Sequence, residues 1–552
     1  MGRRTAAPGR SVGPDTARAC SDARRHRGAM RYRRMDPSPR PRSRSRHHEG
    51  GSVTGNGFNL ITDPWIPVAG GPVSIEQALL DAHDIDGWPC SDPAFSEALM
   101  RLLVPMVYRI TGMDDPKLSR YEFADQQRRL LEKGRLDPDR VRSYLDRHRD
   151  RFWLVHPPAS QQPFAQDPTL AAVEPKPPSK LVVSWASGNN PLLGPHAPSG
   201  MLPPAEAAQQ LLVQRCYASG GLHTKHPAHA GSGRFVGAAL RGTTCVHPIG
   251  SSLAKTFIGH LVPLPPDTSF GQTWWEETSV EIVAPYRYRA GLLEQIAVRQ
   301  DKTMLLYAAI TGEITGFTIS EGRGRDTALD CLDPYWLMNA EREPIKPREG
   351  RAFWREAEAL LSSTDDGRRA ASATILEWAA DPDGGGGNYP PNAFSWAAIS
   401  HRGDKSKELA WSCSHASNLL NIFEPAVAMR CLEFLAAAAD AERQMAKQLA
   451  KAWHSADVMP SDPKSKNAVY APARATFWGR CEMDFWDAAR SPVDAEQRDE
   501  RLREYALAGY DDATAHLLHE RRSHLAVVES REWIARWRRQ PDVTTDRGDV
   551  AA

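Results

Sequence analysis

The strongest constraint on the fold is the apolar spacing of the last quarter of the chain, where strand-like patterns are absent after about residue 415. Apolar side chains there recur every three to four residues, which places them along one face of a helix. Four such stripes follow one another between residues 416 and 540, and they predict a C-terminal four-helix bundle. The stripes begin with Val427, Cys431, Leu435, Ala438, Ala441, Met445, Leu449 and Trp453, continue with Phe477, Cys481 and Phe485, then Leu502, Tyr505, Ala513 and Leu517, and end with Ile534 and Trp537.

Residues 57–415 show a different pattern, with short segments of both kinds. Strand-like runs at 304–310, 314–319 and 394–399 alternate with helical spacing over 75–155, 204–217 and 353–361. Ser74 is placed to cap the first helix, and the alternation over 58–68 before Gly70 and Gly71 predicts a short hairpin. The fold class is therefore α+β: a large mixed α/β N-terminal domain (57–415), the helical bundle (416–540) and a disordered tail (541–552).

The first 56 residues contain 14 Arg but almost no aliphatic side chains, so we expect them to be disordered. One interpretation is a basic arm that neutralises nucleic-acid phosphates. The other is a misplaced start, because Glu49, Gly50 and Gly51 must be encoded by a purine-rich string resembling a ribosome-binding site just before Val53, and GTG, one of the valine codons, can initiate. Both interpretations stay open at this point.

Charge and composition exclude several classes of protein. Residues 57–552 carry 55 basic against 64 acidic side chains, which rules out a uniformly basic nucleic-acid coat. No apolar run approaches the roughly 18–20 residues of a membrane span, and the N-terminus lacks a signal-peptide core. The eight cysteines never form a CxxC pair, so we expect a cytoplasmic protein with free thiols and no structural zinc.

Catalytic signatures are mostly absent: there is no phosphate-binding P-loop, HExxH, GxSxG or GxGxxG motif. His83 and Asp84 form the dipeptide that metal-dependent phosphohydrolases use, and they define an alternative function of that class. Two further groups are explained more simply by polar loops and turns, because a proline interrupts the first and another follows the second. They are His223, His226 and His229, and Asp330 and Asp333.

Three loops suit contact with a nucleic-acid groove. Gly220 and Gly221 lack a Cβ atom, so their main chain can approach a sugar-phosphate backbone closely. Arg323 and Arg325 lie among glycines, and Arg402 opens HRGDKSK (401–407), which we expect to be a strand-to-helix loop. Taken alone, each of these loops is explained more simply as a plain turn.

The string FNLITDPWIPV (58–68) resembles the start of the large subunit of the type I-E CRISPR Cascade surveillance complex, the CasA family. Further similar strings follow in the family's order across about residues 57–540. They are QPFAQ (162–166), SWASGNNPLLGPHAPSG (184–200), ALRGTT (239–244), TGF (315–317), FWREAEALL (353–361) and ARATFW (473–478).

The resemblance implies a non-catalytic subunit of an antiviral, RNA-guided complex. Such a subunit recognises the protospacer-adjacent motif on double-stranded DNA, starts strand separation and recruits a separate helicase-nuclease. Its implied partners are the 5′ end of the guide RNA, the target DNA, the helicase-nuclease, and the backbone, 5′-handle-binding and small subunits. No cofactor, metal or membrane contact is implied, and residues 282–315 lack the cysteine cluster that some relatives carry.

The resemblance also implies roles for particular residues. The family's glycine loop falls on 218–221, so Ser219, Gly220 and Gly221 would contact the motif from the minor groove, where base readout is degenerate. Three further sets complete the implied site. They are a wedge that opens the duplex (Arg402, Gly403, Asp404, Lys405, Ser406), minor-groove cation candidates (Arg323, Arg325), and a loop that would contact guide RNA and neighbouring subunits (Trp185, Asn189, Asn190, Gly194).

Overall fold

The computed structural model divides the chain into two units, Met1–Val53 and Thr54–Ala552. The described residues all belong to the second unit; the Arg-rich extension and the tail after residue 538 lie outside them. The described ranges are 57–88, 91–157, 163–183, 200–222, 234–235, 237–277, 291–298, 302–321, 333–348, 351–362, 369–390, 393–404, 407–417, 419–519 and 521–538.

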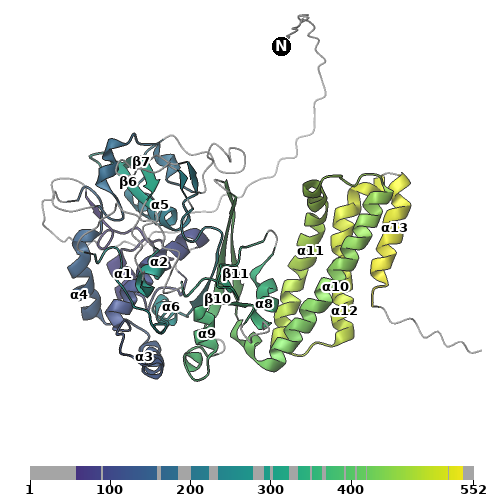
Figure 1. Ribbon diagram of the computed structural model, residues 1–552, viewed down its shortest axis with the longest axis horizontal. Coiled ribbons are helices and arrows are strands. Elements are labelled where there is room, and N and C mark those ends of the chain that lie inside the picture. The colour runs from purple at the N-terminus through teal and green to yellow at the C-terminus, as the bar shows by residue number, and fades with distance from the viewer. Residues whose placement is uncertain are drawn as a thin grey trace, which may run out of the picture. The chain divides into compact units, whose positions relative to one another are not determined.

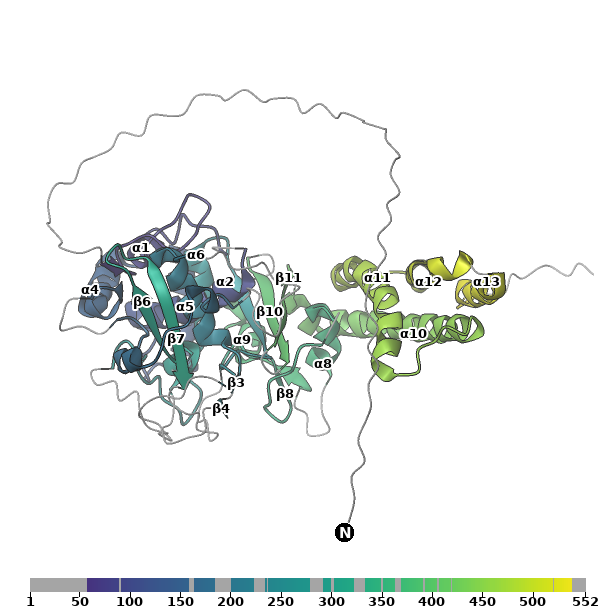
Figure 2. The ribbon, with the colours of Figure 1, turned by 90° about the horizontal axis from the view of Figure 1, so that it is seen from above.

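Helices dominate this part of the chain (Figures 1 and 2). The α-helices are α1 (Ile75–Leu80), α2 (Pro93–Thr111), α3 (Arg120–Lys133), α4 (Pro138–His148), α5 (Pro204–Tyr217), α6 (Leu253–Gly259), α7 (Leu292–Ile296), α8 (Ala357–Leu361), α9 (Thr374–Ala380), α10 (Pro425–Ser455), α11 (Pro463–Arg490), α12 (Ala495–Thr514) and α13 (Arg521–Ala535). The 3₁₀ turns are η1 (Arg149–Arg151), η2 (Pro168–Ala172), η3 (Pro178–Lys180), η4 (Phe353–Glu356), η5 (Gly386–Asn388), η6 (Leu419–Phe423) and η7 (Ala515–His519).

The strands are short apart from three pairs, and every described pairing is antiparallel. The largest described sheet has the order β11-β10-β5, and the others have two strands each, β1-β2, β3-β4, β6-β7 and β8-β9. The bounds are β1 (Phe58–Asn59), β2 (Trp153–Val155), β3 (Gly221–Leu222), β4 (Arg234–Phe235), β5 (Thr244–Ile249), β6 (Lys302–Ala308), β7 (Ile314–Glu321), β8 (Met338–Asn339), β9 (Ala371–Ser372), β10 (Ser395–Asp404) and β11 (Lys407–Ala416). The mixed helix and sheet fold predicted from the sequence is therefore confirmed.

The local signals for the N-terminal helices act as expected. Ser74 caps α1 through a capping box with Gln77. Asp92 caps α2 by accepting from two backbone amides, and Gly112 ends that helix with a positive φ of 75°. Nearly every residue of α2 is buried, so this helix forms the centre of the core around which α4, α5, α6 and α7 pack.

Two sequence predictions were wrong in detail. The alternation over 58–68 does not fold back on itself as a hairpin, because β1 pairs with β2, about 95 residues later. Only an isolated bridge, from Ile66 to Val73, spans the Gly70–Gly71 turn. The segment 401–407 is not a strand-to-helix loop either, since β10 continues to Asp404 and pairs with a second strand, β11. His401 sustains the strand there because it is buried against Trp411 of β11.

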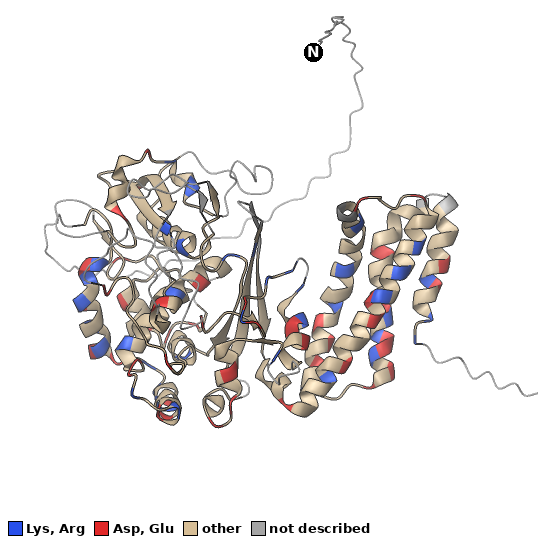
Figure 3. Ribbon diagram, viewed as in Figure 1, with Lys and Arg blue, Asp and Glu red and all other residues tan. Residues whose placement is uncertain are grey.

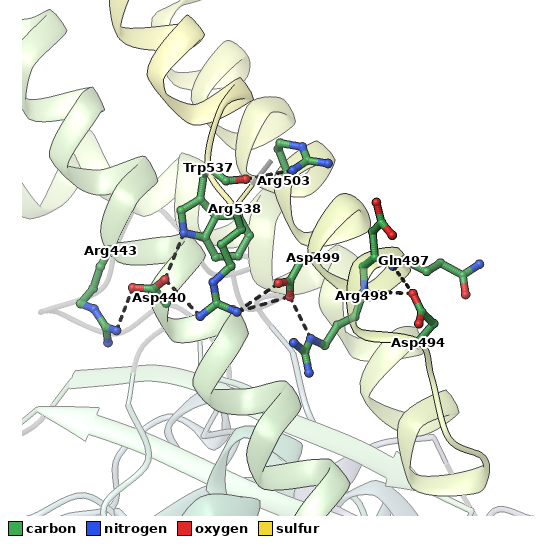
Figure 4. A network of polar contacts seen from close by, with 10 residues as sticks. Asp440, Arg443, Asp494, Gln497, Arg498, Asp499, Arg503, Trp537 and Arg538 are labelled. Atoms are coloured by element: carbon green, nitrogen blue, oxygen red, sulfur yellow. Dashed lines mark hydrogen bonds and ion pairs between the residues drawn. The ribbon is translucent and has the colours of Figure 1, made fainter. Parts of the chain in front are cut away.

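The C-terminal helices α10–α13 lie alongside one another, and α11, α12 and α13 each pack against α10 (Figure 1). Basic and acidic residues are interspersed along the described parts of these helices (Figure 3). A polar network fastens the end of α13 to α10 and α12 (Figure 4). Arg538 pairs with Asp440 and Asp499 at 3.4 and 3.2 Å, while Trp537 Nε1 donates to Asp440 at 3.0 Å. In the described part of the chain, no helix combines the length and apolar character needed to cross a bilayer.

Candidate nucleic-acid interface

The predicted glycine loop leaves the end of α5. Tyr217 is the last helical residue, and residues 218–220 continue as irregular chain into β3. Gly221 has a φ of 125°, a backbone conformation that side chains disfavour, and it pairs with Phe235 of β4. Ser219, Gly220 and Gly221 are all partly exposed. The loop therefore offers accessible main chain on a fixed helix end.

A bridging segment, residues 237–243, connects this loop to the wedge strand β10. On one side its amides donate to the end of α5 and to the residue after it: Leu240 N to Cys216 O at 3.0 Å and Ala238 N to Ala218 O at 2.9 Å. On the other side Gly242 N donates to His401 Nδ1 at 3.0 Å, and Thr243 O accepts from His401 N at 3.1 Å. Two loops that lie about 180 residues apart in sequence are thus held side by side.

The side chain of Arg241 spans the same gap. Its Nη1 donates to Tyr217 O over 3.5 Å, at the carbonyl end of α5, where the helix dipole favours a cation. A Cβ atom added to Gly237 would lie only 2.6 Å from Arg241 Cδ, and one added to Gly403 would lie 2.4 Å from Arg241 Nη2. Two glycines therefore make room for this arginine.

Three aromatic rings pack together at the junction between the glycine loop and strand β10. Tyr217 lies 5.1 Å from His401 and 6.0 Å from Trp411, and the latter two rings are 4.8 Å apart. Burial raises the pKa of Tyr217 well above its usual value, so the phenol stays uncharged. The loop end, the strand and its partner strand consequently share one packed base.

The predicted wedge is the tip of the β10–β11 hairpin. Arg402 pairs with Ala410, the register shifts after it, and Asp404 then pairs with Lys407. Such a bulge increases the local twist and re-aims the residues beyond it. Lys405 and Ser406, which connect the two strands, lie outside the described residues.

A basic groove of about 560 Å³ lies beside the root of this hairpin. Four arginines line it together with three serines of the sheet and a single carboxylate, Glu482 of α11; these arginines are Arg348, Arg351, Arg355 and Arg402. Arg355 stacks over Trp478 at 3.7 Å. Burial, and secondly the charge of Arg351, lowers the pKa of Arg355 to about 10.

A buried ionic network holds β5 and thereby the sheet that carries the wedge. Arg101 of α2 donates to Glu97 at 2.6 Å, to Cys245 Sγ at 3.3 Å, and to Asp333. All four residues are almost completely buried. Burial alone would raise the pKa of Glu97, but its contacts with His247 and Arg101 lower it to about 2, so the carboxylate is ionised.

Hydrogen bonds connect this network to two buried histidines, His247 and His260. Thr256 O can only accept, so His260 Nδ1, 2.7 Å away, must donate. Burial, and secondly the neighbouring His247, lowers the pKa of His260 to about 3, so this ring is neutral and its Nε2 accepts from His247 Nδ1 at 3.0 Å. His247 Nε2 faces the ionised Glu97 at 2.5 Å. His247 therefore donates from Nδ1 to His260, and it holds its Nε2 against the Glu97 carboxylate.

Glu97, Cys245 and His247 present possible metal ligands within 4.8 Å of one another. The set does not fit a metal ion, since Arg101 already hydrogen-bonds to two of the three members. Burial also raises the pKa of the Cys245 thiol, which disfavours the thiolate that a metal would bind. The group is explained by the ionic network alone.

The other candidates separate into two groups. His83 and Asp84 lie 3.5 Å apart on the surface after α1, and within the described ranges no further His, Cys, Asp or Glu joins them in a metal-binding cluster. Asp333 is the partner of Arg101 rather than a simple turn residue. The remaining candidates lie outside the described residues: Arg323, Arg325, Trp185, Asn189, Asn190, Gly194, His223, His226, His229 and Asp330.

Sequence reasoning missed Arg241, Arg355 and the Arg101–Asp333 pair. Arg241 stands inside ALRGTT and Arg355 inside FWREAEALL, two strings that were used only for the resemblance. Glycines on both sides of Arg241, at 237 and 242, were the available signal for a tightly packed arginine. Nothing local in the sequence marks Arg101 and Asp333 as partners, because they are 232 residues apart.

Comparison with known structures defines the class of protein. A chain described as a CRISPR RNA-guided surveillance complex superimposes with a TM-score of 0.71 at 23% identity, covering 87% of this chain and 99% of the other. CasA (Cse1) of Thermus thermophilus superimposes with a TM-score of 0.68 at 23% identity, covering 87% and 98%. The fold is thus that of the Cse1-type CRISPR proteins.

The sequence comparisons identify the family. The family model for the CRISPR-associated protein Cse1 matches residues 59–517. The CRISPR-associated protein CasA/Cse1 of Thermus thermophilus is 38% identical over 218 residues, so the aligned part spans 38% of this chain and only 40% of that relative. The chain belongs to the Cse1 family, also named CasA, which confirms the resemblance seen in the sequence.

Proposed function

We propose that this chain is the non-catalytic large subunit of a type I-E CRISPR Cascade complex. It recognises the protospacer-adjacent motif on double-stranded DNA, starts strand separation and recruits the helicase-nuclease. Family membership supports this proposal, as does the likeness of the fold to a chain described as a CRISPR RNA-guided surveillance complex. The guide RNA, the other Cascade subunits and the target DNA are the partners that follow.

One observation carries the proposal: the bridging segment holds the glycine loop beside the wedge hairpin. A loop of accessible main chain suits a narrow groove, and a strand tip beside it suits insertion between base pairs. Unstacking costs a few kcal/mol per step, which motif contacts and the first guide–DNA pairs must offset. The arginines of the basic groove supply positive charge for a nearby phosphate backbone.

The test is binding of the reconstituted complex to duplexes with randomised flanks. We expect a defined motif preference that Gly220→Asp and Lys405→Ala weaken without altering assembly. Gly387→Asp and Lys117→Ala are matched controls, since both positions are exposed and a Cβ at Gly387 meets no atom within 4 Å. Unchanged motif preference in both test variants contradicts the site assignment. Binding that never depends on the flank supports a purely structural scaffold instead.

The phosphohydrolase alternative makes an opposite prediction. Purified protein with Mn²⁺ or Ni²⁺ should then cleave single-stranded DNA, and His83→Ala should abolish the cleavage. We expect no cleavage from either protein, because the described residues around His83 and Asp84 lack the additional ligands that such a centre requires.

A further inference from the structure

The contacts of Arg241 suggest a role beyond local packing. Its stem passes Gly237 and its guanidinium reaches Gly403, where added Cβ atoms would lie 2.6 and 2.4 Å away. The same guanidinium donates to Tyr217 O, one residue before the glycine loop. One side chain therefore touches the root of the glycine loop and the wedge hairpin together.

We propose that Arg241 is a positioning residue that sets the spacing between the glycine loop and the wedge hairpin, so that motif contact and strand opening occur as one event. This inference rests on the proposed function. A planar guanidinium with several fixed donors suits the role, since it can contact two groups in a defined geometry that an ammonium cannot reproduce.

The physical consequence concerns how binding energy is used. Motif contacts release free energy at the glycine loop, whereas base-pair opening consumes it at the hairpin tip. The free energy released by motif contacts can drive base-pair opening only if the hairpin tip already lies at the correct distance when the glycine loop binds the motif. A misplaced tip would not be in position to open the first base pair. Arg241 should therefore matter for a closed duplex and not for DNA that is already open.

The experiment compares two DNA targets in the fully assembled complex. Both carry the preferred motif; in one the first base pairs of the target are paired, and in the other they are mismatched and open. Arg241→Gln should weaken binding of the closed duplex about ten-fold, the effect of losing one charged contact, and should leave the open target within about two-fold. Arg241→Lys should recover part of the loss.

A double-mutant cycle supplies an independent readout. Gly403→Ala places a methyl group 2.4 Å from Arg241 Nη2, the flexible end of that side chain, so the methyl should displace the guanidinium rather than unfold the hairpin. Gly403→Ala alone should then reproduce the closed-duplex defect. In the Arg241→Gln background it should add almost nothing, because the group that it displaces is already absent.

Three results would overturn the inference. Equal loss on both targets would assign Arg241 a general structural role, and additive effects in the cycle would show that the two positions act separately. No loss relative to Arg536→Gln, an exposed arginine just after α13, would show that the contact has no consequence. If the unmodified complex shows no dependence on the flanking motif, the proposed function itself fails, and that outcome is recognised before any variant is measured. Should Arg241→Gln not assemble, Gly403→Ala alone on both targets decides the question.

Discussion

Replacing Glu97 by Gln should destabilise the fold strongly although the two side chains have nearly the same shape. The carboxylate accepts from Arg101 Nε and His247 Nε2, and it compensates charge in a place that water does not reach. The Gln amide carries no negative charge, and its NH₂ group would have to face Arg101 Nε or His247 Nε2, which are themselves donors. Breaking a buried ion pair by removing one partner costs about 3–5 kcal/mol.

The pKa of Glu97 provides a second route to this magnitude. Its fall from 4.5 to about 2 corresponds to roughly 3 kcal/mol of stabilisation at neutral pH, at about 1.4 kcal/mol for each pH unit. A unit of about 500 residues has an unfolding entropy near 1 kcal/mol per degree. We therefore expect the unfolding midpoint in calorimetry to fall by about 3–5 °C at pH 7. Glu532→Gln, which removes an exposed pair with Arg536, should change it by less than about 1 °C.

The pH dependence tests the cause. The pKa of Glu97 is lower in the folded protein than in the unfolded chain, so its stabilisation is complete above about pH 4.5 and is lost as the pH falls toward 2. The difference between wild type and Glu97→Gln should consequently shrink between pH 5 and pH 3. The low pKa of His260 destabilises both proteins in acid, and this effect largely cancels in the difference. A difference that stays constant down to pH 3 would refute the reasoning.

Three further predictions concern other parts of the chain. Arg355→Gln should weaken binding of a single-stranded oligonucleotide and lower the slope of log K against log salt by about 0.7, as expected for one lost phosphate contact in titrations at several salt concentrations. Asp440→Ala should speed amide exchange around Trp537, measured by mass spectrometry, because it removes the acceptor of the Trp537 ring N–H just after α13. At pH 8 iodoacetamide should modify the half-buried Cys413 before Cys216, whose pKa burial raises to about 12.

Local sequence signals were sufficient wherever the structure is decided locally. The helix predicted over 204–217 has those bounds as α5, since a proline starts it and the Ser-Gly-Gly segment follows its end. Ser74 caps α1 for the same kind of reason. β10 was predicted too short because His401 and Arg402 resemble loop residues. Their partner strand and the ring of Trp411 become visible only in the folded chain.

In the candidate site, too, the sequence predicted the local features but not the contacts between distant residues. Glycines and isolated arginines pointed to the glycine loop and the hairpin tip, and the family resemblance assigned them roles. The proximity of these two loops depends on the bridging segment and on a side chain that contacts residues 24 and 162 positions away. The Arg101–Asp333 pair depends on a contact over 232 residues. Periodicity and turn chemistry carry no information about such distances.

The charge distribution and the buried network support one physical account of this molecule. Lys, Arg, Asp and Glu are mixed along the described elements (Figure 3), so under the proposed function we expect attraction to DNA to be concentrated at a few loops rather than spread over a broad face. Loops with few contacts discriminate poorly unless their positions are fixed, since each loosely held group must be ordered on binding. The rings packed at the junction and the ionic network that contacts β5 would provide that fixation before any DNA is bound. If the proposed function holds, the stability of the buried core and the readout of a short motif are therefore linked through the pairing of β5 with β10.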